Sequence, residues 1–289
     1  MRLTLPTTLD WLRDRPGGRE WLATLPDTLA EVSAQWSLRV GQPYQGSYVS
    51  LVVPATQPDG TAAVLKLQYP EPDSRYEAAA LRTWDGGGAV RLLAHDERRL
   101  ALLLERCEPG TPLSSMPPEY ALARYLELLP RLWRPPAGPF TTAEREAARW
   151  TTELPARWER AGRPCERRLV DAAVATLSEL RGSQGEQVLL NQDLHGGNVL
   201  RSRREPWLVI DPKPLIGERE LAIASVVHDY GLGYGRDETE WRFARLTAEL
   251  GLDRDRARGW AFARTLVQAF QDDAWMDQHI ATARWLLSA

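Results

Sequence analysis

The chain has 289 residues, 43% of them hydrophobic and 26% charged, which is ordinary for a globular protein with one large domain or two lobes. Its formal net charge of -3 argues against nucleic-acid binding, because such binding needs a surplus of clustered cations. The two cysteines, Cys107 and Cys165, form neither a CxxC pair nor a zinc-ligand spacing, and no apolar run is long enough for a membrane span or a signal peptide. We therefore expect a reduced, cytoplasmic protein that binds neither nucleic acid nor membranes.

The first third of the sequence predicts helices followed by a sheet. Apolar residues between positions 8 and 38 recur at helical spacing, interrupted at Pro16 and Pro26, so we expect two or three short helices. An alanine-rich stretch that begins near Ser74 and ends at a triple glycine predicts one further helix. Around it, short apolar or β-rich runs separated by turn residues predict four strands of one sheet, at residues 48–54, 61–69, 90–95 and 100–106.

The rest of the chain is mainly helical in pattern. Apolar residues three and four positions apart predict helices at residues 117–133, 141–162 and 164–182, and again from about Glu218 onward. Between these helices lie a strand at 188–190, a polar loop at 191–198, and a hairpin of strands at 198–202 and 207–211. Because strands give way to helices near residues 105–110, we expect an N-terminal lobe at 1–106, with a helical extension at 1–38, and a C-terminal lobe at 107–289.

The polar loop NQDLHGGN carries the main chemical signal. Asp193 and Asn198 lie in this loop, and Asp211 closes the hairpin that follows. A short hairpin brings the loop and the end of its second strand into one place, where an amide oxygen and a carboxylate are suitable hard ligands for Mg²⁺. The third group, Asp193, can then accept a hydrogen bond from a substrate hydroxyl. This is the division of labour used in phosphoryl transfer.

The predicted sheet supplies a cation for the same chemistry. Lys66 lies inside an apolar strand, where an ammonium group is costly unless it meets an anion, and Glu77 on the next helix is a ready partner. A strand lysine that pairs with a helix glutamate and with nucleotide phosphates is typical of protein-kinase-like enzymes. The loop at residues 45–50, which contains Gly46 and Ser47, is a candidate cover for the phosphates, although a single glycine is a weak signal.

Taken together, these motifs resemble the aminoglycoside phosphotransferases of the protein-kinase-like fold. The resemblance is strongest to the streptomycin 6-phosphotransferase, or aminoglycoside and hydroxyurea resistance kinase, branch, and it covers residues 19–289. It rests on five stretches in order: SLVVPATQPDGTAAVLKLQ, RTWDGGGAVRLLAHD, LLLERCEPGTPL, DLHGGNVL and REPWLVIDPKPLIGE. The fold class implied is α+β, with two lobes: a small antiparallel sheet plus a helix at the N-terminal side, and a larger helical C-terminal lobe.

The resemblance also implies a role for each motif residue. Asp193 is the implied catalytic base, and Asn198 and Asp211 the implied Mg²⁺ ligands. The implied nucleotide-binding residues are Lys66 and Glu77 at the phosphates, Gly46 and Ser47 in the covering loop, and the backbone from Glu105 to Cys107 at the adenine. The activity expected from these roles is ATP- and Mg²⁺-dependent transfer to a hydroxyl of a small cationic molecule. The resemblance points to a streptomycin-type aminoglycoside, so that transfer inactivates the antibiotic and confers resistance.

Acidic residues near the end of the chain are candidates for binding such an acceptor. Ammonium or guanidinium groups are recognised by fixed carboxylates, and Asp272, Asp273 and Asp277 follow the apolar face of a late helix, where the alternative is a solvated surface. Asp229 and Glu220 are further candidates for the same pocket. His228 and Asp229 stand where the family has a Trp-Asn pair, close to the expected acceptor site.

Two positions depart from the family pattern and keep other functions open. Asn191 stands where the family has a histidine, and Ala222 stands where it has an aspartate that braces the catalytic loop. One alternative is a kinase of an amino sugar or another metabolite, and a second is a nucleotide-binding pseudokinase with a regulatory role. Against the pseudokinase stands the complete set formed by Lys66, Glu77, Asp193, Asn198 and Asp211.

Overall fold

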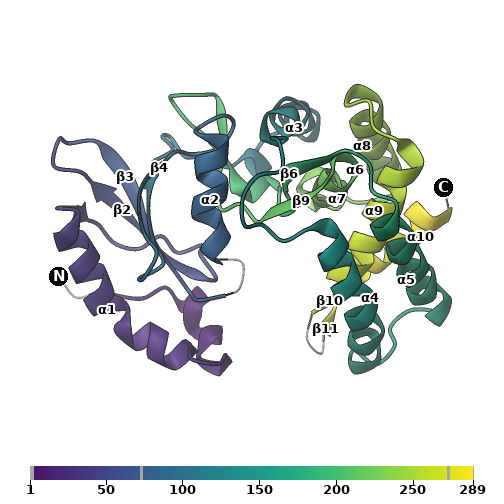
Figure 1. Ribbon diagram of the computed structural model, residues 1–289, viewed down its shortest axis with the longest axis horizontal. Coiled ribbons are helices and arrows are strands. Elements are labelled where there is room, and N and C mark those ends of the chain that lie inside the picture. Colours follow the sequence, from purple (N-terminus) through teal and green to yellow (C-terminus); the bar gives the residue numbers. More distant parts are fainter. Residues whose placement is uncertain (1–2, 72–73, 272–273, 289) are drawn as a thin grey trace. The chain divides into compact units, whose positions relative to one another are not determined.

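The structure is a computed structural model that describes residues 3–71, 74–271 and 274–288. The chain forms two compact units (Figure 1). The first contains residues 1–110 together with 201–208, and the second contains residues 111–200 and 209–289. The N-terminal unit thus runs four residues beyond the expected boundary at 106, and it includes the connection of the predicted hairpin.

The first unit is built on a five-stranded antiparallel sheet in the order β1-β2-β3-β5-β4. The strands and helices follow the predicted order closely, with one additional two-residue strand, β1. The elements are η1 (Thr7–Asp14), α1 (Gly18–Gln35), β1 (Arg39–Val40), β2 (Ser50–Thr56), β3 (Ala62–Gln68), α2 (Ser74–Trp84), β4 (Leu92–Asp96) and β5 (Ala101–Glu105).

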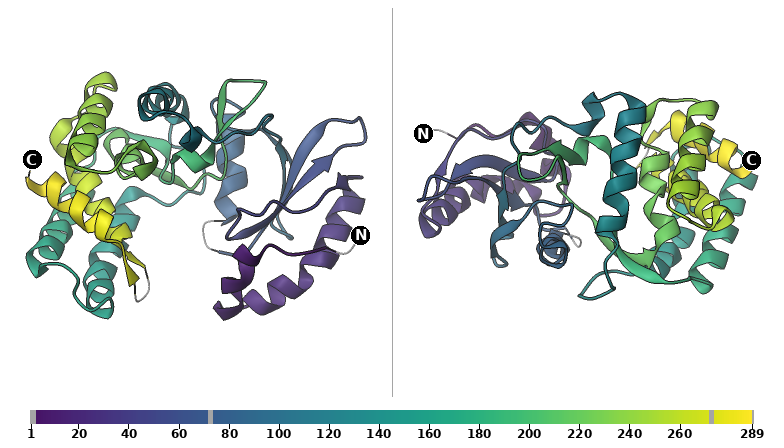
Figure 2. Two further views of the ribbon diagram at one scale, coloured as in Figure 1. Left: turned by 180° about the vertical axis from the view of Figure 1, so that it is seen from behind. Right: turned by 90° about the horizontal axis from the view of Figure 1, so that it is seen from above.

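Alternation along β3 assigns its side chains to two different environments. Ala63, Leu65 and Leu67 belong to a hydrophobic core shared with α1 and η1. Because successive strand residues point to opposite faces, Lys66 points away from this core, and there it meets α2. Figure 2 shows α1 running along the sheet in views from behind and from above.

The expected break at Pro26 does not occur. Pro26 lies inside the 18-residue helix α1. A proline removes one backbone hydrogen bond and strains the preceding turn. The helix continues because Leu22, Leu25, Leu29 and Val32 are all buried, and their packing outweighs this cost.

The second unit is mainly helical, with the polar loop between short strands. The predicted strand before the loop is β6, and the predicted hairpin is β7 and β8. Sequence patterns missed β9, the antiparallel partner of β6, because its five residues include a proline and a glycine. The elements are η2 (Leu113–Ser115), α3 (Pro118–Leu132), α4 (Ala143–Arg160), α5 (Arg167–Gly182), β6 (Gln187–Asn191), η3 (Gly196–Asn198), β7 (Val199–Arg201), β8 (Trp207–Val209), β9 (Pro214–Glu218), α6 (Arg219–Ala222), α7 (Ala224–Val227), η4 (Tyr230–Leu232), α8 (Arg236–Glu249), α9 (Arg254–Ala269), β10 (Phe270–Gln271), β11 (Ala274–Trp275) and α10 (Asp277–Ser288).

No helix in the described part of the chain is both long enough and apolar enough to cross a membrane.

Candidate active site

Lys66 and Glu77 form a buried ion pair in the first unit. Lys66 Nζ lies 2.6 Å from Glu77 Oε2, and both side chains are almost fully buried. Gln68, two residues further along β3, donates a hydrogen bond from Nε2 to the same carboxylate oxygen, also at 2.6 Å. Gln68 was not predicted as a site residue from the sequence, although its place on the Lys66 face of the strand was a usable signal. The pair expected from the sequence is therefore formed, with a second donor beside it.

The loop that contains Gly46 and Ser47 is held by the N-terminal extension. Thr8 Oγ1 donates to the carbonyl of Ser47 at 2.6 Å, and Trp11 Nε1 donates to the carbonyl of Tyr48 at 2.9 Å. A side chain added at Gly46 would meet no atom within 4 Å, so this part of the loop is open on the side of a Cβ. Both tethering residues belong to η1, which gives the extension a role in positioning this loop.

Glu105 is fixed by an arginine from the hairpin connection. Arg204 donates to both carboxylate oxygens of Glu105, at 2.7 and 2.8 Å, and to the carbonyls of Gly86 and Ala89. The backbone N–H of Glu105 donates to the carbonyl of Arg91. Arg204 thus ties the end of β5 to the triple-glycine turn after α2, an interaction that sequence spacing did not reveal.

Cys107 follows two residues after Glu105. Burial, reinforced by the negative charge of Glu105, raises the pKa of the Cys107 thiol to about 11. The thiol is therefore protonated at neutral pH, and the side chain behaves as a small apolar group.

In the second unit, Asn191 organises the polar loop. Its Oδ1 accepts hydrogen bonds from the backbone N–H of Asp193 at 3.1 Å and of Lys213 at 2.9 Å. The backbone N–H of Gln192 donates to the carbonyl of Lys213. Asn191 is buried, so it serves as the scaffold that joins the loop to the segment after Asp211.

The carboxylate of Asp193 meets the ammonium of Lys213. The distance from Lys213 Nζ to Asp193 Oδ2 is 3.0 Å, and the Lys213 side chain is half exposed. Partial burial lowers the pKa of Lys213, but the attraction of Asp193 outweighs it, so on balance the pKa is raised and the side chain is charged. Lys213 was not predicted as a site residue from the sequence, because its partner is 20 positions away and only the fold brings the two together.

Asn198 and Asp211 lie on adjacent backbones, as the hairpin predicted. The N–H of Ile210 donates to the carbonyl of Asn198 at 2.9 Å. Asn198 Nδ2 donates to the carbonyl of Asp193 at 3.2 Å, which fixes the amide and leaves its oxygen as the atom for a cation. Asp211 has a left-handed φ of 48°, a conformation that aspartate tolerates better than most residues and that often marks functional sites.

This donor set suits Mg²⁺. Over residues 3–71, 74–271 and 274–288, no three His, Cys, Asp or Glu side chains converge as a metal cluster. One carboxylate and one amide oxygen are a set that Mg²⁺ completes with phosphate and water. The residues therefore fit a metal that arrives with a nucleotide rather than one bound permanently by the protein alone.

Asp229 supplies a brace for the polar loop. Its Oδ2 accepts from Tyr125 Oη at 2.7 Å and from the backbone N–H of Gly196 at 3.0 Å, and its Oδ1 accepts from Gly231 N–H at 3.0 Å. Burial, and then the charge of Asp229, raises the pKa of Tyr125 well above its ordinary value, so Tyr125 stays a donor. A carboxylate seven residues after Ala222 thus fixes the polar loop. The acceptor-binding role expected for Asp229 stays a prediction, and these bonds favour the bracing role.

The glycines of the loop serve close packing rather than a left-handed turn. A Cβ at Gly196 would lie 2.7 Å from the backbone nitrogen of Ser114, so no side chain fits there without movement. Gly196 and Gly197 are not among the glycines with positive φ, so neither is required for a left-handed turn. His195 Nδ1 accepts a hydrogen bond from Gly197 N–H at 3.1 Å, so this histidine stabilises the loop.

The other residues that were predicted to bind the acceptor differ in burial and in hydrogen-bond partners. Burial, and then the neighbouring His279, holds the pKa of His228 well below its ordinary value, so His228 is neutral and packs near Thr265. Asp277 accepts from Trp275 Nε1, and Glu220 accepts from Asp253 N–H, and both contacts are exposed. Asp272 and Asp273 lie outside the described residues.

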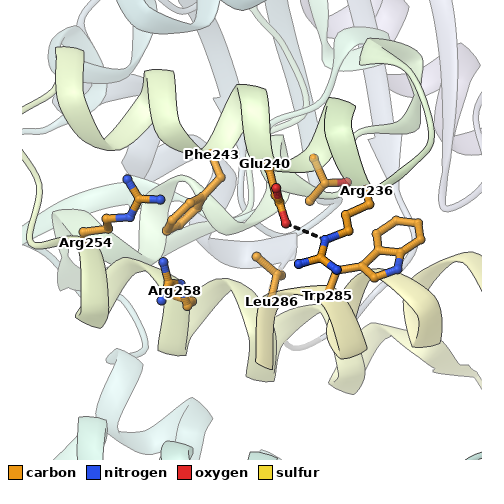
Figure 3. A pocket seen from close by; sticks show the side chains of 8 residues that line it. Arg236, Glu240, Phe243, Arg254, Arg258, Trp285 and Leu286 are labelled. Atoms are coloured by element: carbon orange, nitrogen blue, oxygen red, sulfur yellow. Dashed lines mark hydrogen bonds and ion pairs between the residues drawn. The ribbon is translucent and has the colours of Figure 1, made fainter. Parts of the chain in front are cut away.

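A cavity of about 280 Å³ lies elsewhere in this unit, between α8, α9 and α10 (Figure 3). Arg254 and Arg258 lie near the Phe243 ring, at 5.6 and 5.7 Å from its centroid, and Arg236 pairs with Glu240. None of the residues predicted from the sequence lines this cavity. Its lining consists of Arg236, Thr239, Glu240, Phe243, Arg254, Arg258, Trp285 and Leu286.

Several solved structures share this fold. A choline/ethanolamine kinase family protein from Mesorhizobium loti matches with a TM-score of 0.64 and 15% identity, over 91% of this chain and 95% of that one. A thermostable mutant of an aminoglycoside phosphotransferase, in complex with AMP-PNP and hygromycin B, matches with a TM-score of 0.59 and 15% identity, over 90% and 95%. The fold is therefore that of the kinase-like small-molecule phosphotransferases, and the expected fold class is confirmed.

Sequence comparison then gives the family. Residues 35–278 match the model of the aminoglycoside/hydroxyurea antibiotic resistance kinases, and the chain belongs to this family of phosphotransferases. A hydroxyurea phosphotransferase from Kitasatospora aureofaciens is 41% identical over 86% of this chain and 73% of that protein. A streptomycin 6-kinase from Streptomyces glaucescens is 37% identical over 88% of this chain and 85% of that protein.

Proposed function

We propose that this protein transfers the γ-phosphoryl group of ATP, with Mg²⁺, to a hydroxyl group of a small antibiotic-like molecule. The observation that carries the proposal is the arrangement around Asp193. Asn191 fixes the backbone of Asp193, and the carboxylate is only partly buried, so a hydroxyl can reach it. Asn198 and Asp211 stand on adjacent backbones beside it. An abandoned active site has no physical need to keep this set, which argues against a pseudokinase.

Each residue has a distinct task in the proposed reaction. Lys66, oriented by Glu77, binds nucleotide phosphates, while the loop with Gly46 and Ser47 covers them and the backbone from Glu105 to Cys107 binds the adenine. Asn198 and Asp211 hold Mg²⁺, which when bound offsets phosphate charge. Asp193 accepts a hydrogen bond from the acceptor hydroxyl and takes its proton as the oxygen bonds to phosphorus. Asp229 and Asn191 keep the loop in the required conformation.

The acceptor we favour is a streptomycin-type aminoglycoside, whose phosphorylation would inactivate the antibiotic. The similarity to streptomycin 6-kinases over 88% of the chain supports this choice. Hydroxyurea is the second candidate, supported by the relative at 41% identity and by the surroundings of Asp193. Two cationic side chains, Lys213 and Arg264, interact electrostatically with the Asp193 carboxylate. Their positive charge repels a strongly cationic acceptor more than a small neutral one.

A substitution at Asp193 tests the reaction. Asp193→Asn is expected to lower the rate of phosphate transfer at least 100-fold while the affinity for an ATP analogue changes less than about threefold, because in the proposed reaction Asp193 contacts the acceptor hydroxyl rather than the nucleotide. Asp171→Asn is the matched control, since Asp171 forms an exposed ion pair with Arg167 on α5. Full turnover in Asp193→Asn would exclude the mechanism.

An acceptor panel tests the substrate. Purified protein with ATP and Mg²⁺ is incubated with streptomycin, hydroxyurea, hygromycin B and simple amino sugars, and phosphorylated product is detected by ³¹P NMR. Streptomycin is expected to react. Reaction with hydroxyurea alone would favour the second candidate, reaction with amino sugars alone the metabolite kinase, and nucleotide binding without any product the pseudokinase.

A further inference from the structure

The chain uses lysine at only two positions. It contains 36 lysine and arginine residues, and since only Lys66 and Lys213 are lysines, the other 34 are arginines. Both lysines contact a carboxylate that belongs to the proposed catalytic set, Glu77 and Asp193 respectively. An ammonium is a compact charge on a flexible stem, whereas a guanidinium is a broad planar fork. The two exceptions to arginine therefore both lie beside a carboxylate of the proposed catalytic set, where a compact cation fits.

The backbone of Lys213 is fixed at both of its polar groups. Its N–H donates to Asn191 Oδ1 at 2.9 Å, and its carbonyl accepts from Gln192 N–H at 3.0 Å. These bonds attach Lys213 to the two residues that precede Asp193. The root of the side chain is thus held at a constant place relative to Asp193, however the rest of the site changes.

The ammonium group of Lys213, by contrast, can move. Its side chain is 51% exposed, and its ion pair with Asp193 is a single contact of 3.0 Å. Exposed pairs of this kind contribute little to stability. A nucleotide phosphate, with more than one negative charge, can therefore attract the ammonium away from the carboxylate or share it.

A second cation near Asp193 is less able to make this movement. Arg264 donates from Nη2 to Gln192 Oε1 at 3.4 Å, and its guanidinium lies 4.6 Å from the centroid of the Trp150 ring. A cation stacked on an aromatic face loses that contact when it moves. Lys213 is therefore the cation better placed to follow the reacting groups.

We propose that Lys213 is a catalytic residue that neutralises the negative charge of the transferring phosphoryl group. This role rests on the proposed kinase function. In the reaction, the acceptor oxygen forms a bond to the γ-phosphorus, and the bond from that phosphorus to the bridging oxygen of ADP breaks. ADP leaves with the electron pair, and the hydroxyl proton passes to Asp193. Negative charge spreads over the three outer oxygens of the moving group, and the Lys213 ammonium meets them from the side of Asp193.

Steady-state kinetics of Lys213→Met test the role. We expect kcat to fall 100-fold or more, as for the loss of other preorganised charge donors, while KM for ATP changes less than threefold. Lys213→Arg should recover part of the rate, because charge returns with a poorer fit. Arg245→Met is the matched control: Arg245 forms a half-exposed ion pair with Glu249 on α8, and its loss should leave kcat unchanged. A kcat for Lys213→Met within threefold of the unmodified protein would overturn the proposal.

A measurement without turnover tests the contact itself. Protein labelled with ¹⁵N at the lysine side-chain nitrogen should give two ammonium signals, and Lys213→Arg identifies which belongs to Lys213. Addition of a non-hydrolysable ATP analogue with Mg²⁺ should shift the Lys213 signal, in Asp193→Asn as well. A saturated complex in which only the Lys66 signal shifts would refute the contact.

The two measurements also separate this proposal from the proposed function. If the unmodified protein transfers phosphate and Asp193→Asn does not, retained activity in Lys213→Met refutes the role of Lys213 alone. If no acceptor is phosphorylated at all, the proposed function fails, and the lysine signals still decide whether Lys213 meets the nucleotide phosphates.

Discussion

The bracing role of Asp229 makes a quantitative prediction for Asp229→Asn. The carboxylate accepts three hydrogen bonds, from Tyr125, Gly196 and Gly231. The amide keeps one oxygen, which can still serve the two donors at Oδ2, but its NH₂ group then faces the N–H of Gly231. One bond is lost, at about 1 kcal/mol, and two charge-assisted bonds become neutral, at about 1 kcal/mol each. We expect the free energy of unfolding to fall by roughly 2–4 kcal/mol.

Urea unfolding and acceptor kinetics together test this reasoning. A stability loss of this size should come with a lower kcat, because Gly196 and the loop that carries Asp193 lose their support. Tyr125→Phe provides a graded comparison, since it removes one of the three bonds and should cost about 1–2 kcal/mol. Unchanged stability in Asp229→Asn, together with a tenfold or greater rise in the acceptor KM, would refute the brace and restore the acceptor-binding role.

Two further predictions concern the loop scaffold and acid stability. Asn191→Ala removes the acceptor for two backbone N–H groups, so we expect the free energy of unfolding to fall by about 1–3 kcal/mol and kcat to fall at least tenfold. Urea titration measures the first quantity and turnover the second. Wild-type values in both measurements would exclude the scaffold role of Asn191. Burial lowers the pKa of His279 to about 4, so below pH 6.5 the unfolded chain binds the proton first and stability decreases as the pH falls toward 4. Between pH 6.5 and 5 this costs about 2 kcal/mol. His279→Phe should flatten the decline in thermal melts, and an unchanged decline would exclude His279 as its cause.

The candidate site shows what spacing can and cannot predict. Asp193, Asn198 and Asp211 were found because one loop and one hairpin connect them, and Lys66 with Glu77 because an apolar strand precedes an amphipathic helix. Arg204, Lys213 and the bracing bonds of Asp229 were not found. Apart from the bond between Asp229 and Gly231, these contacts join segments 20 to 118 positions apart, and nothing in the local pattern of an arginine or an aspartate indicates its distant partner.

The two departures from the family pattern show the same limit. By sequence, Asn191 and Ala222 were reasons to consider a pseudokinase. In the fold, Asn191 Oδ1 accepts hydrogen bonds from two backbone N–H groups, and Asp229 supplies a carboxylate that braces the same loop. A scaffold is defined by an atom at a place in space, and a residue of another type or position can supply it.

The sequence by itself determined the two-lobed α+β class, the order of strands and helices, and the residues of the family motifs, because periodicity, turn residues and short loops act over a few positions. It also contained the contrast between 34 arginines and two lysines, but without a reason for it. Tertiary structure decided which side chains meet: it carried the helix through Pro26 by burying one apolar face, joined Asp193 to Lys213, and placed Asp229 against the polar loop. Such contacts depend on packing between distant segments, which a linear pattern does not encode.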